Sequence, residues 1–184
     1  MLIPVEIDSQ ELLVRFVFAD DFKKSNFSKE KIIAGEVFID TRGKGVSLQR
    51  GNYTTTNFCV DSAKSISTKV FVGFVFFLKQ SYLDACGLML LERPAFNSEL
   101  MFTPMDESGA YLEKKDKIGS EDKGNPSHAD IYYIDPKLMM TPEEQTPNVA
   151  LRLFSKKLCS KSKILVKFDD EVVSLVELYE NNAE

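Results

Sequence analysis

The sequence is poor in the residues that build metal sites and disulfide frameworks. Histidine occurs once, at His128, which excludes any site that needs several histidine ligands. The three cysteines, Cys59, Cys86 and Cys159, lie too far apart for the close paired spacing of a zinc site or for a fully paired disulfide framework. Unpaired cysteines are typical of a reducing compartment. We therefore expect a cytoplasmic protein with no metal and no cofactor.

Long apolar runs and targeting signals are missing as well. The longest apolar run, from Val70 to Leu78, is about half the length of a membrane span and is typical of a buried strand. The first eight residues lack a basic stretch followed by an apolar one, which predicts neither secretion nor targeting. The P-loop, G-x-G-x-x-G and H-E-x-x-H motifs are also absent. The sequence therefore predicts no membrane partner and carries none of these nucleotide or metalloprotease signatures.

Positive charge is scarce relative to negative charge. The net charge of −5 disfavours a protein that coats nucleic acid, because that mode of binding depends on lysine and arginine displacing phosphate counterions. One local exception lies near the C-terminus, where a basic run fits a solvated helix face better than a nucleic-acid surface. This run consists of Arg152, Lys156, Lys157, Lys161, Lys163 and Lys167.

The residues that are present have an ordinary globular composition. A chain of 184 residues, of which 43% are hydrophobic, is long and apolar enough to form one domain around its own core. With 14 phenylalanines and no tryptophan, most of the aromatic volume of that core is expected to come from phenylalanine. No repeat or low-complexity linker divides the chain. We expect a single α+β domain over residues 1–184, with a mixed or mainly antiparallel sheet and one C-terminal amphipathic helix packed on it.

Short runs rich in β-branched and aromatic residues predict the strands of this sheet. Residues 36–40 and 46–50 flank a glycine-containing turn, which predicts a hairpin. Residues 69–78 are almost entirely apolar, as in a strand covered on both faces, and are expected near the centre of the sheet. Further strands are expected at residues 11–18, 87–92, 99–103, 131–134 and 164–168.

Helices are expected where capping residues precede an apolar period. Residues 54–57 offer hydroxyl and amide caps for a short helix over residues 58–67. A threonine followed by proline begins the most regular helix, over residues 147–159. Residues 172–179 fit either a strand or a final helix. The charged, glycine-containing residues 106–124 are expected to form a long surface excursion.

The polar turn just before the strand at residues 131–134 presents the only histidine. Asn125 is biased towards an extended backbone by Pro126, whose ring fixes the local φ angle, and Ser127 can bond the turn. These restraints predict that His128 is held in a defined direction. An imidazole has an unperturbed pKa of about 6.5, so it can carry a proton either way near neutral pH.

A carboxylate side chain lies close to the histidine in the sequence. Asp130 lies two residues after His128 and would share its face of a strand, where it can orient the ring or raise its pKa. The segment over residues 125–131 resembles an N-P-x-H-A-x-I/V box of short uncharacterised bacterial proteins, whose preceding strand-rich half carries arginines and an S-x-x-R-like segment. Residues 47–50 of this chain, Ser-Leu-Gln-Arg, stand in a comparable place. The resemblance implies no activity.

Two arginines are further candidates for a site that includes His128. Arg15 lies within an apolar strand, so its guanidinium must reach solvent, a carboxylate or an anionic ligand. Together, Arg15, Arg50 and His128 predict an anion-binding cleft that receives a phosphorylated or nucleotide-like ligand. The structural alternatives are a salt bridge for Arg15 and a hydrogen bond from His128 to a nearby carbonyl oxygen.

Three functions are open from the sequence. The favoured one is a bacterial cytosolic binding or interaction module, one component of a multi-protein system, whose contact surface combines residues 106–124 with the turn at His128. The second is an enzyme acting on a phosphodiester or nucleotide, with His128 as general acid or base and Arg15 and Arg50 as an anion clamp. The third, a nucleic-acid binder that uses the C-terminal lysines, is disfavoured by the net charge.

A lone histidine with no partner base, nucleophile or metal cluster is thin support for catalysis, which is why the binding module is favoured. Its expected partners are another protein or a second copy of the chain, with an anionic small molecule as the ligand. Besides the catalytic candidate His128, the residues expected at the site are Arg15, Ser47, Arg50, Asn125, Ser127 and Asp130.

Overall fold

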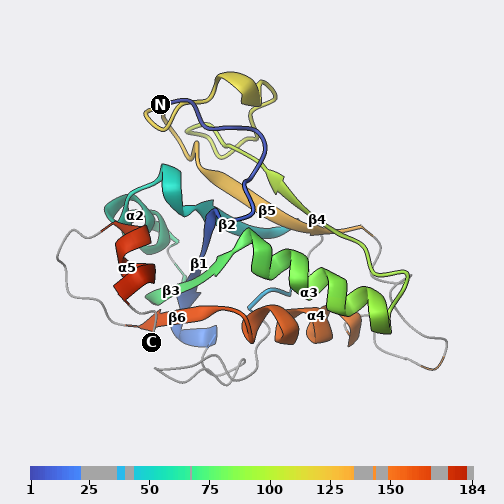
Figure 1. The fold of residues 1–184 in the computed structure, drawn as a ribbon. Coiled ribbons are helices and arrows are strands. Elements are labelled where there is room, and N and C mark those ends of the chain that lie inside the picture. The colour runs from blue at the N-terminus through green and yellow to red at the C-terminus, as the bar shows by residue number, and fades with distance from the viewer. Residues whose placement is uncertain are drawn as a thin grey trace.

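An antiparallel sheet of six strands organises the computed structural model of the chain (Figure 1). The structure describes residues 1–21, 37–39, 44–66, 68–134, 143, 149–166 and 174–181. The strand order is β4-β5-β2-β1-β3-β6, and each neighbouring pair is antiparallel. The strands are β1 (Leu12–Phe18), β2 (Val46–Arg50), β3 (Phe71–Leu78), β4 (Ser98–Phe102), β5 (His128–Tyr133) and β6 (Lys163–Val166).

Helices cover both faces of the sheet. On one face, α3 (Lys79–Glu92) and α4 (Val149–Cys159) lie side by side over the larger apolar core (Figure 1). On the other face, α2 (Thr56–Ser65) and α5 (Leu175–Asn181) cover a second apolar cluster that includes Phe74 and Phe76 of β3. This arrangement confirms the expected α+β domain with a C-terminal helix, and the sheet is wholly antiparallel rather than mixed.

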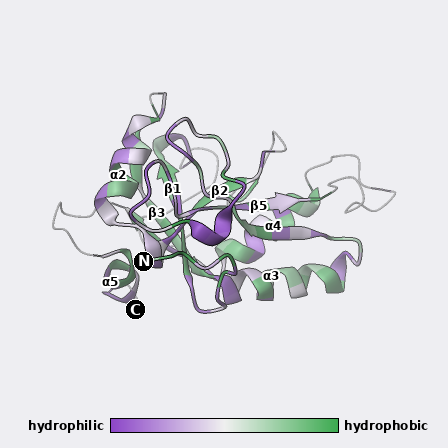
Figure 2. Ribbon diagram, turned by 90° about the horizontal axis from the view of Figure 1, so that it is seen from above, coloured by the Kyte–Doolittle hydropathy of each residue, from purple (hydrophilic) through white to green (hydrophobic). Residues whose placement is uncertain are grey.

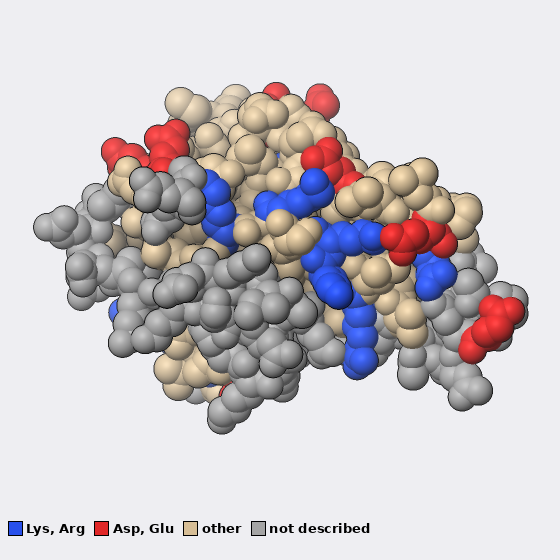
Figure 3. Space-filling model, turned by 60° about the horizontal axis from the view of Figure 1, so that its bottom comes forward, with Lys and Arg blue, Asp and Glu red and all other residues tan. Residues whose placement is uncertain are grey.

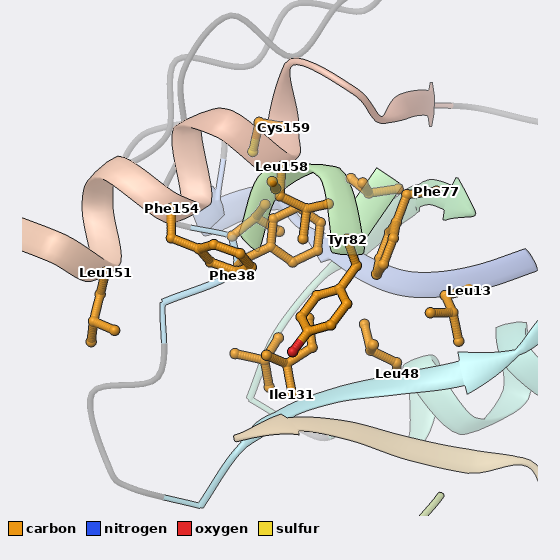
Figure 4. Packing of buried hydrophobic residues seen from close by; sticks show 14 of the residues in the cluster. Leu13, Phe38, Leu48, Phe77, Tyr82, Ile131, Leu151, Phe154, Leu158 and Cys159 are labelled. Atoms are coloured by element: carbon orange, nitrogen blue, oxygen red, sulfur yellow. The ribbon is translucent and has the colours of Figure 1, made fainter. Parts of the chain in front are cut away.

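Aromatic packing under α4 forms the centre of the larger core (Figure 4). Phe154 is completely buried, stacks on Phe96 with ring centroids 5.0 Å apart, and meets Tyr82 and Tyr133 edge to face at 6.0 and 5.8 Å. Edge-to-face and offset-stacked rings add to the free energy gained from burying their area. The apolar side of α4 therefore fixes this helix on the sheet.

Most of the expected strands are present within a few residues of the predicted bounds. The apolar run that predicted an interior strand forms β3, which is flanked by β1 and β6. The short helix expected after residues 54–57 is α2, and the Thr55 hydroxyl accepts a hydrogen bond from the Phe58 N–H at 3.2 Å. Of the two alternatives for residues 172–179, the described part is helical, as α5.

Two predicted elements are wrong. Residues 87–92 are the second half of α3 and not a strand, because Tyr82, Ala85 and Met89 recur at helical spacing on the buried side. The expected hairpin is also not formed by the residues that the structure describes: residues 37 and 38 form a turn, and the sheet neighbours of β2 are β1 and β5. Phe38 is buried in the core instead, where its N–H donates to the Ser155 hydroxyl of α4 at 3.3 Å.

Some predicted features fall outside the described residues. They include residues 36 and 40 of the hairpin and the predicted start of the α4 helix at Thr146 and Pro147. Within the described part of the chain, no helix combines the length and the apolar character needed to cross a bilayer.

The segment over residues 106–124 lies against the N-terminal residues at one end of the sheet (Figure 1). Its only described helical element is the 3-10 turn Lys115–Lys117, and most of its residues are exposed. The Ile3 N–H donates to the Ile118 carbonyl oxygen at 2.8 Å, and both side chains join a small cluster with Phe102. The excursion is thus anchored to the domain by its own apolar residues.

The described part of the basic run near the C-terminus, which leaves out Lys167, is a solvated surface with internal ion pairs. Lys157 pairs with Glu92 at 2.6 Å and Lys161 with Asp84 at 3.5 Å, while the Lys163 ammonium lies 4.1 Å from the centre of the Tyr179 ring. Figure 3 shows lysine and arginine side chains gathered on the lower side of the molecule, with acidic side chains beside them. The acidic partners lower the net positive charge that a phosphate backbone would meet.

Candidate functional site

The turn that precedes β5 is held by backbone contacts on two sides. The Asn125 N–H donates to the Met105 carbonyl at 2.9 Å, and the Met105 N–H donates back to the Asn125 carbonyl at 3.0 Å. On the other side, the Arg50 N–H donates to the Ser127 carbonyl at 2.9 Å, and the Ser127 hydroxyl donates to the Gln49 amide oxygen at 3.0 Å. These bonds hold the turn in a defined direction, as the sequence predicts.

Gly124 allows the turn to pass close to the backbone of Asp106. Its φ angle is +89°, in the left-handed region that glycine adopts without strain. A Cβ atom at this position would lie 2.4 Å from the Asp106 carbonyl carbon, which is far inside van der Waals contact. Only glycine therefore fits here without displacing the backbone.

His128 is the first residue of β5 and is 3% exposed. Its Nδ1 lies 3.0 Å from both the carbonyl oxygen and the hydroxyl oxygen of Thr103. Because a carbonyl oxygen only accepts hydrogen bonds, Nδ1 carries the proton in this arrangement. The Thr103 hydroxyl is then free to donate onward to Asp130 Oδ2 at 2.8 Å.

Hydroxyl groups donate hydrogen bonds to the fully buried carboxylate of Asp130. Oδ2 accepts from Thr103 and, at 3.1 Å, from the Tyr111 hydroxyl, which itself accepts from Tyr132 at 3.1 Å. Oδ2 also lies 3.5 Å from His128 Nδ1. Among the described residues, Oδ1 of Asp130 has no hydrogen-bond partner. The network therefore links Thr103, which directly follows β4, with β5 and with the excursion at Tyr111 inside the protein.

Burial decides the charge state of the imidazole. Loss of solvation lowers the pKa of His128 below its ordinary value of about 6.5, and this outweighs the Asp130 carboxylate and the Thr103 carbonyl, which both raise it. Burial likewise raises the pKa of Tyr111, as do its contacts with Tyr132 and Asp130. At neutral pH, His128 is neutral and Tyr111 is protonated. The expectation that Asp130 shares the face of His128 is met, but the net shift is downward.

This shift predicts a pH dependence of folding. In the window between the lowered pKa of folded His128 and about 6.5, the unfolded chain binds the extra proton and the folded chain does not. Stability is therefore fully present above about pH 6.5 and falls as the pH drops through that window, by at most about 1.4 kcal/mol per pH unit from this group. Urea unfolding of the wild type and of His128→Gln between pH 7.5 and 5 measures the difference. Equal pH profiles for the two proteins would contradict a depressed histidine pKa.

Arg50 is buried by internal partners. Its guanidinium is completely buried and forms an ion pair with Glu11 through Nε and, at 2.7 Å, through Nη2. It also donates to the carbonyl oxygens of Pro4 and, at 3.2 Å, Glu6. The rings of Tyr53 and Phe102 lie 4.9 and 4.7 Å from its central carbon. Arg50 thus anchors the N-terminal segment on the sheet.

Arg15 and Ser47 come together elsewhere. Arg15 Nη1 donates to the Ser47 carbonyl oxygen at 2.9 Å, and both residues line a cavity of about 180 Å³ together with Gly45 and Gln49. Thus Arg15 meets Ser47, Arg50 meets Glu11, and His128 meets Asp130. The structure does not gather Arg15, Arg50 and His128 around one cleft.

A cleft lies beside the Asn125–Ser127 turn. It has a volume of about 430 Å³, and we call it the main cleft. Tyr53 and Phe58 supply aromatic surface, and Asp122 is the one acidic side chain among its described lining residues, which include no lysine, arginine, histidine or cysteine. The lining residues are Met1, Asn52, Tyr53, Thr54, Thr55, Phe58, Ser120, Asp122, Pro126 and Ser127.

The cysteines do not supply a reactive thiol. All three are free. Burial raises the pKa values of Cys59 and Cys159 to about 12, and it also raises that of Cys86. Because the thiolate is the nucleophile, thiols that stay protonated at neutral pH are poor ones.

Sequence reasoning missed Glu11, Thr103 and Tyr111. Each meets its partner across at least 19 residues of chain, so no local spacing indicates the contact. Within the described residues, no group of three or more histidine, cysteine, aspartate or glutamate side chains is placed to hold a metal ion. Comparison with protein-family models, curated proteins and solved structures found no match to this chain.

Proposed function

We propose that this protein is a binding module whose ligand occupies the main cleft beside the Pro126–Ser127 turn. The observation that carries the proposal is the cleft itself, which falls within the volume range of small-molecule sites. It combines apolar rings with a small number of hydroxyl and amide groups, which is the usual composition of such a site. Placement of the protein in a bacterial cytosol, within a multi-protein system, belongs to the same proposal.

The charge of the lining selects the ligand class. Asp122 contributes a carboxylate, and no described side chain of the cleft contributes a positive charge. The ammonium group of Met1 also lines the cleft, but it is paired with Glu121 Oε2 at 2.8 Å, so an anion would meet no unpaired counter-charge. The Ser127 hydroxyl donates to Gln49 and keeps lone pairs that can accept a hydrogen bond from a ligand. The ligand we propose is a neutral or cationic small molecule with an aromatic part that packs between Tyr53 and Phe58.

Binding is favoured over catalysis by the state of the reactive groups. His128 is buried and neutral, and it does not line the main cleft. Arg50, the second member of the anion clamp, is buried and engaged by Glu11 and by carbonyl oxygens. A phosphodiesterase mechanism needs these groups to touch the substrate. Two of the three side chains that the enzyme alternative requires are therefore not positioned to touch a substrate.

A thermal-shift screen tests the binding proposal. We expect at least one neutral or cationic compound, from a panel of nucleosides, amines and aromatic amino acids, to raise the melting temperature of the wild type. Ser120→Trp fills the cleft from an exposed position and should abolish the shift. Ser160→Trp, at an exposed serine that does not line the cleft, should preserve it.

Two results would count against the proposal. A panel that shifts none of the proteins, or that shifts Ser120→Trp as strongly as the wild type, rejects the main cleft as the ligand site. Hydrolysis of bis(p-nitrophenyl) phosphate by the wild type, lost in His128→Ala with folding preserved, would support the enzyme alternative instead. We expect no such hydrolysis.

A further inference from the structure

Two neighbouring strands in the interior of the sheet are paired over only part of their length. β1 and β2 lie next to each other (Figure 2), but within the described residues they pair at two positions only, which are Leu13–Arg50 and Val14–Gln49. Their outer sides are paired further. β1 pairs with β3 along its whole length, and β2 pairs with β5 over all but its last residue. We call the unpaired stretch, residues 15–18 of β1 and 46–48 of β2, the seam.

A side chain bridges the seam where backbone bonds would otherwise join the strands. The backbone groups of an antiparallel strand point alternately towards its two neighbours, so some groups of the seam face the other strand without a ladder partner there. Arg15 Nη1 donates to the Ser47 carbonyl oxygen across the seam at 2.9 Å. The opening that remains is the smaller cavity of about 180 Å³, which both strands line. The cavity is therefore a gap in the sheet itself.

The smaller cavity is accessible and carries a positive charge. Ser47 is exposed and Arg15 is half-buried, so solvent reaches the seam. Arg15 is the one charged side chain among the described residues that line the cavity, and a guanidinium keeps its charge throughout the pH range of proteins. An anion there would meet a counter-charge and no acidic lining residue. The other lining residues are Val14, Phe16, Phe18, Gly45, Ser47, Leu48, Gln49 and Ile66.

Charged groups around the cavity do not reverse this sign. Phe18 has one neighbour of each charge: Lys69 Nζ lies 5.2 Å from the centre of its ring, and Asp21 Oδ2 accepts a hydrogen bond from its N–H at 2.7 Å. Asp130 Oδ1 would lie 3.2 Å from a Cβ atom at Gly45, but Asp130 is fully buried and does not line the cavity. Arg15 therefore sets the charge that a ligand in the cavity contacts.

We propose that the seam binds a small oxyanion, a phosphate or a carboxylate group, through the Arg15 guanidinium and the backbone N–H groups that face the gap. The planar fork of a guanidinium matches both kinds of oxyanion. The cavity is smaller than the roughly 300–1,000 Å³ of sites for drug-sized ligands, so the ligand is small. Of the three basic residues expected around an anion, Arg15 alone belongs to this site. The seam and the main cleft share no described lining residue, so this site is independent of the proposed function.

Titration of ¹⁵N-labelled protein with sodium phosphate, and separately with sodium acetate, tests the site. Sodium chloride holds the ionic strength constant. A few charge-assisted hydrogen bonds should give at least one of the two anions a dissociation constant on the order of 1 mM. The largest amide shifts should fall on Phe16, Ser47 and Leu48. Saturation by phosphate alone identifies a phosphate ligand, saturation by acetate alone identifies a carboxylate ligand, and saturation by both shows recognition of the shared oxyanion.

Two substitutions at Ser47 provide a matched pair that leaves Arg15 in place. Ser47→Asp adds a carboxylate that competes with the ligand for the guanidinium, and it should weaken anion binding at least about tenfold. Ser47→Asn adds a side chain of the same size without the charge and should bind like the wild type. Both changes fall on an exposed side chain, so the melting temperature should stay close to that of the wild type.

Arg15→Gln removes the charge directly and should also abolish binding, with Arg152→Gln on α4 as the exposed control. If Arg15→Gln does not fold, the Ser47 pair still decides the question. Three results overturn the proposal: no saturable shift at the seam with either anion, shifts confined to the lysines of the α4 region, or binding that Ser47→Asp leaves at the strength of Ser47→Asn.

Discussion

Replacing Arg50 with methionine is expected to lower the free energy of unfolding by about 3–5 kcal/mol, because it leaves the Glu11 carboxylate buried without its counter-charge. The carbonyl oxygens of Pro4 and Glu6 lose their donors as well. In a chain of this size, that loss corresponds to a fall of roughly 6–20 °C in melting temperature. Urea and thermal unfolding measure both quantities.

The control for this prediction is an exposed arginine. Arg152→Met on α4 should change the free energy of unfolding by less than about 1 kcal/mol. The double variant Arg50→Met with Glu11→Leu removes both charges and should recover part of the loss, since the stranded carboxylate disappears. If Arg50→Met is as mild as Arg152→Met, the guanidinium does not anchor the N-terminal segment in the way described.

Gly124→Ala is expected to cost about 2–5 kcal/mol. About 1–2 kcal/mol comes from a Cβ at positive φ, and about 1–3 kcal/mol comes from displacing the Asp106 backbone, which the new Cβ would meet at 2.4 Å. The displacement should also distort the turn that lines the main cleft. Urea unfolding measures the stability, and the thermal-shift compounds measure the loss of binding.

Gly109 separates these two contributions. Its φ angle is +81°, close to that of Gly124, but a Cβ there would meet nothing within 4 Å. Gly109→Ala therefore carries the backbone strain without the collision and should cost only about 1–2 kcal/mol. Equal losses for the two variants would show that Gly124 is not a close-contact position.

The sequence predicted the fold best where the pattern was local. The apolar run of β3, the capped start of α2 and the apolar side of α4 each follow from residues that are neighbours in the chain. The strand predicted at residues 87–92 failed because an apolar run ending in leucines does not distinguish a strand from a helix with exposed leucines. The hairpin failed because Phe38 packs beside α4 rather than in the sheet.

The site was only partly predictable. The turn before β5 and the shared face of His128 and Asp130 follow from short spacings and from proline chemistry. The pairing of Arg50 with Glu11, and the approach of Tyr111 to Asp130, depend on how distant segments are brought together. Local sequence contains no information on such contacts until the strand order is known. Burial of His128 likewise follows from β4 and the excursion and not from the turn itself.

The main cleft as the ligand site is tested most directly by amide chemical shifts. A compound that raises the melting temperature is titrated into ¹⁵N-labelled protein, and the amides that move are mapped onto the structure. We predict that the largest changes fall on Tyr53, Thr55, Ser120 and Ser127, which line the main cleft. Changes concentrated instead on Arg15, Gly45 and Ser47 would place the ligand in the smaller cavity and would contradict the account.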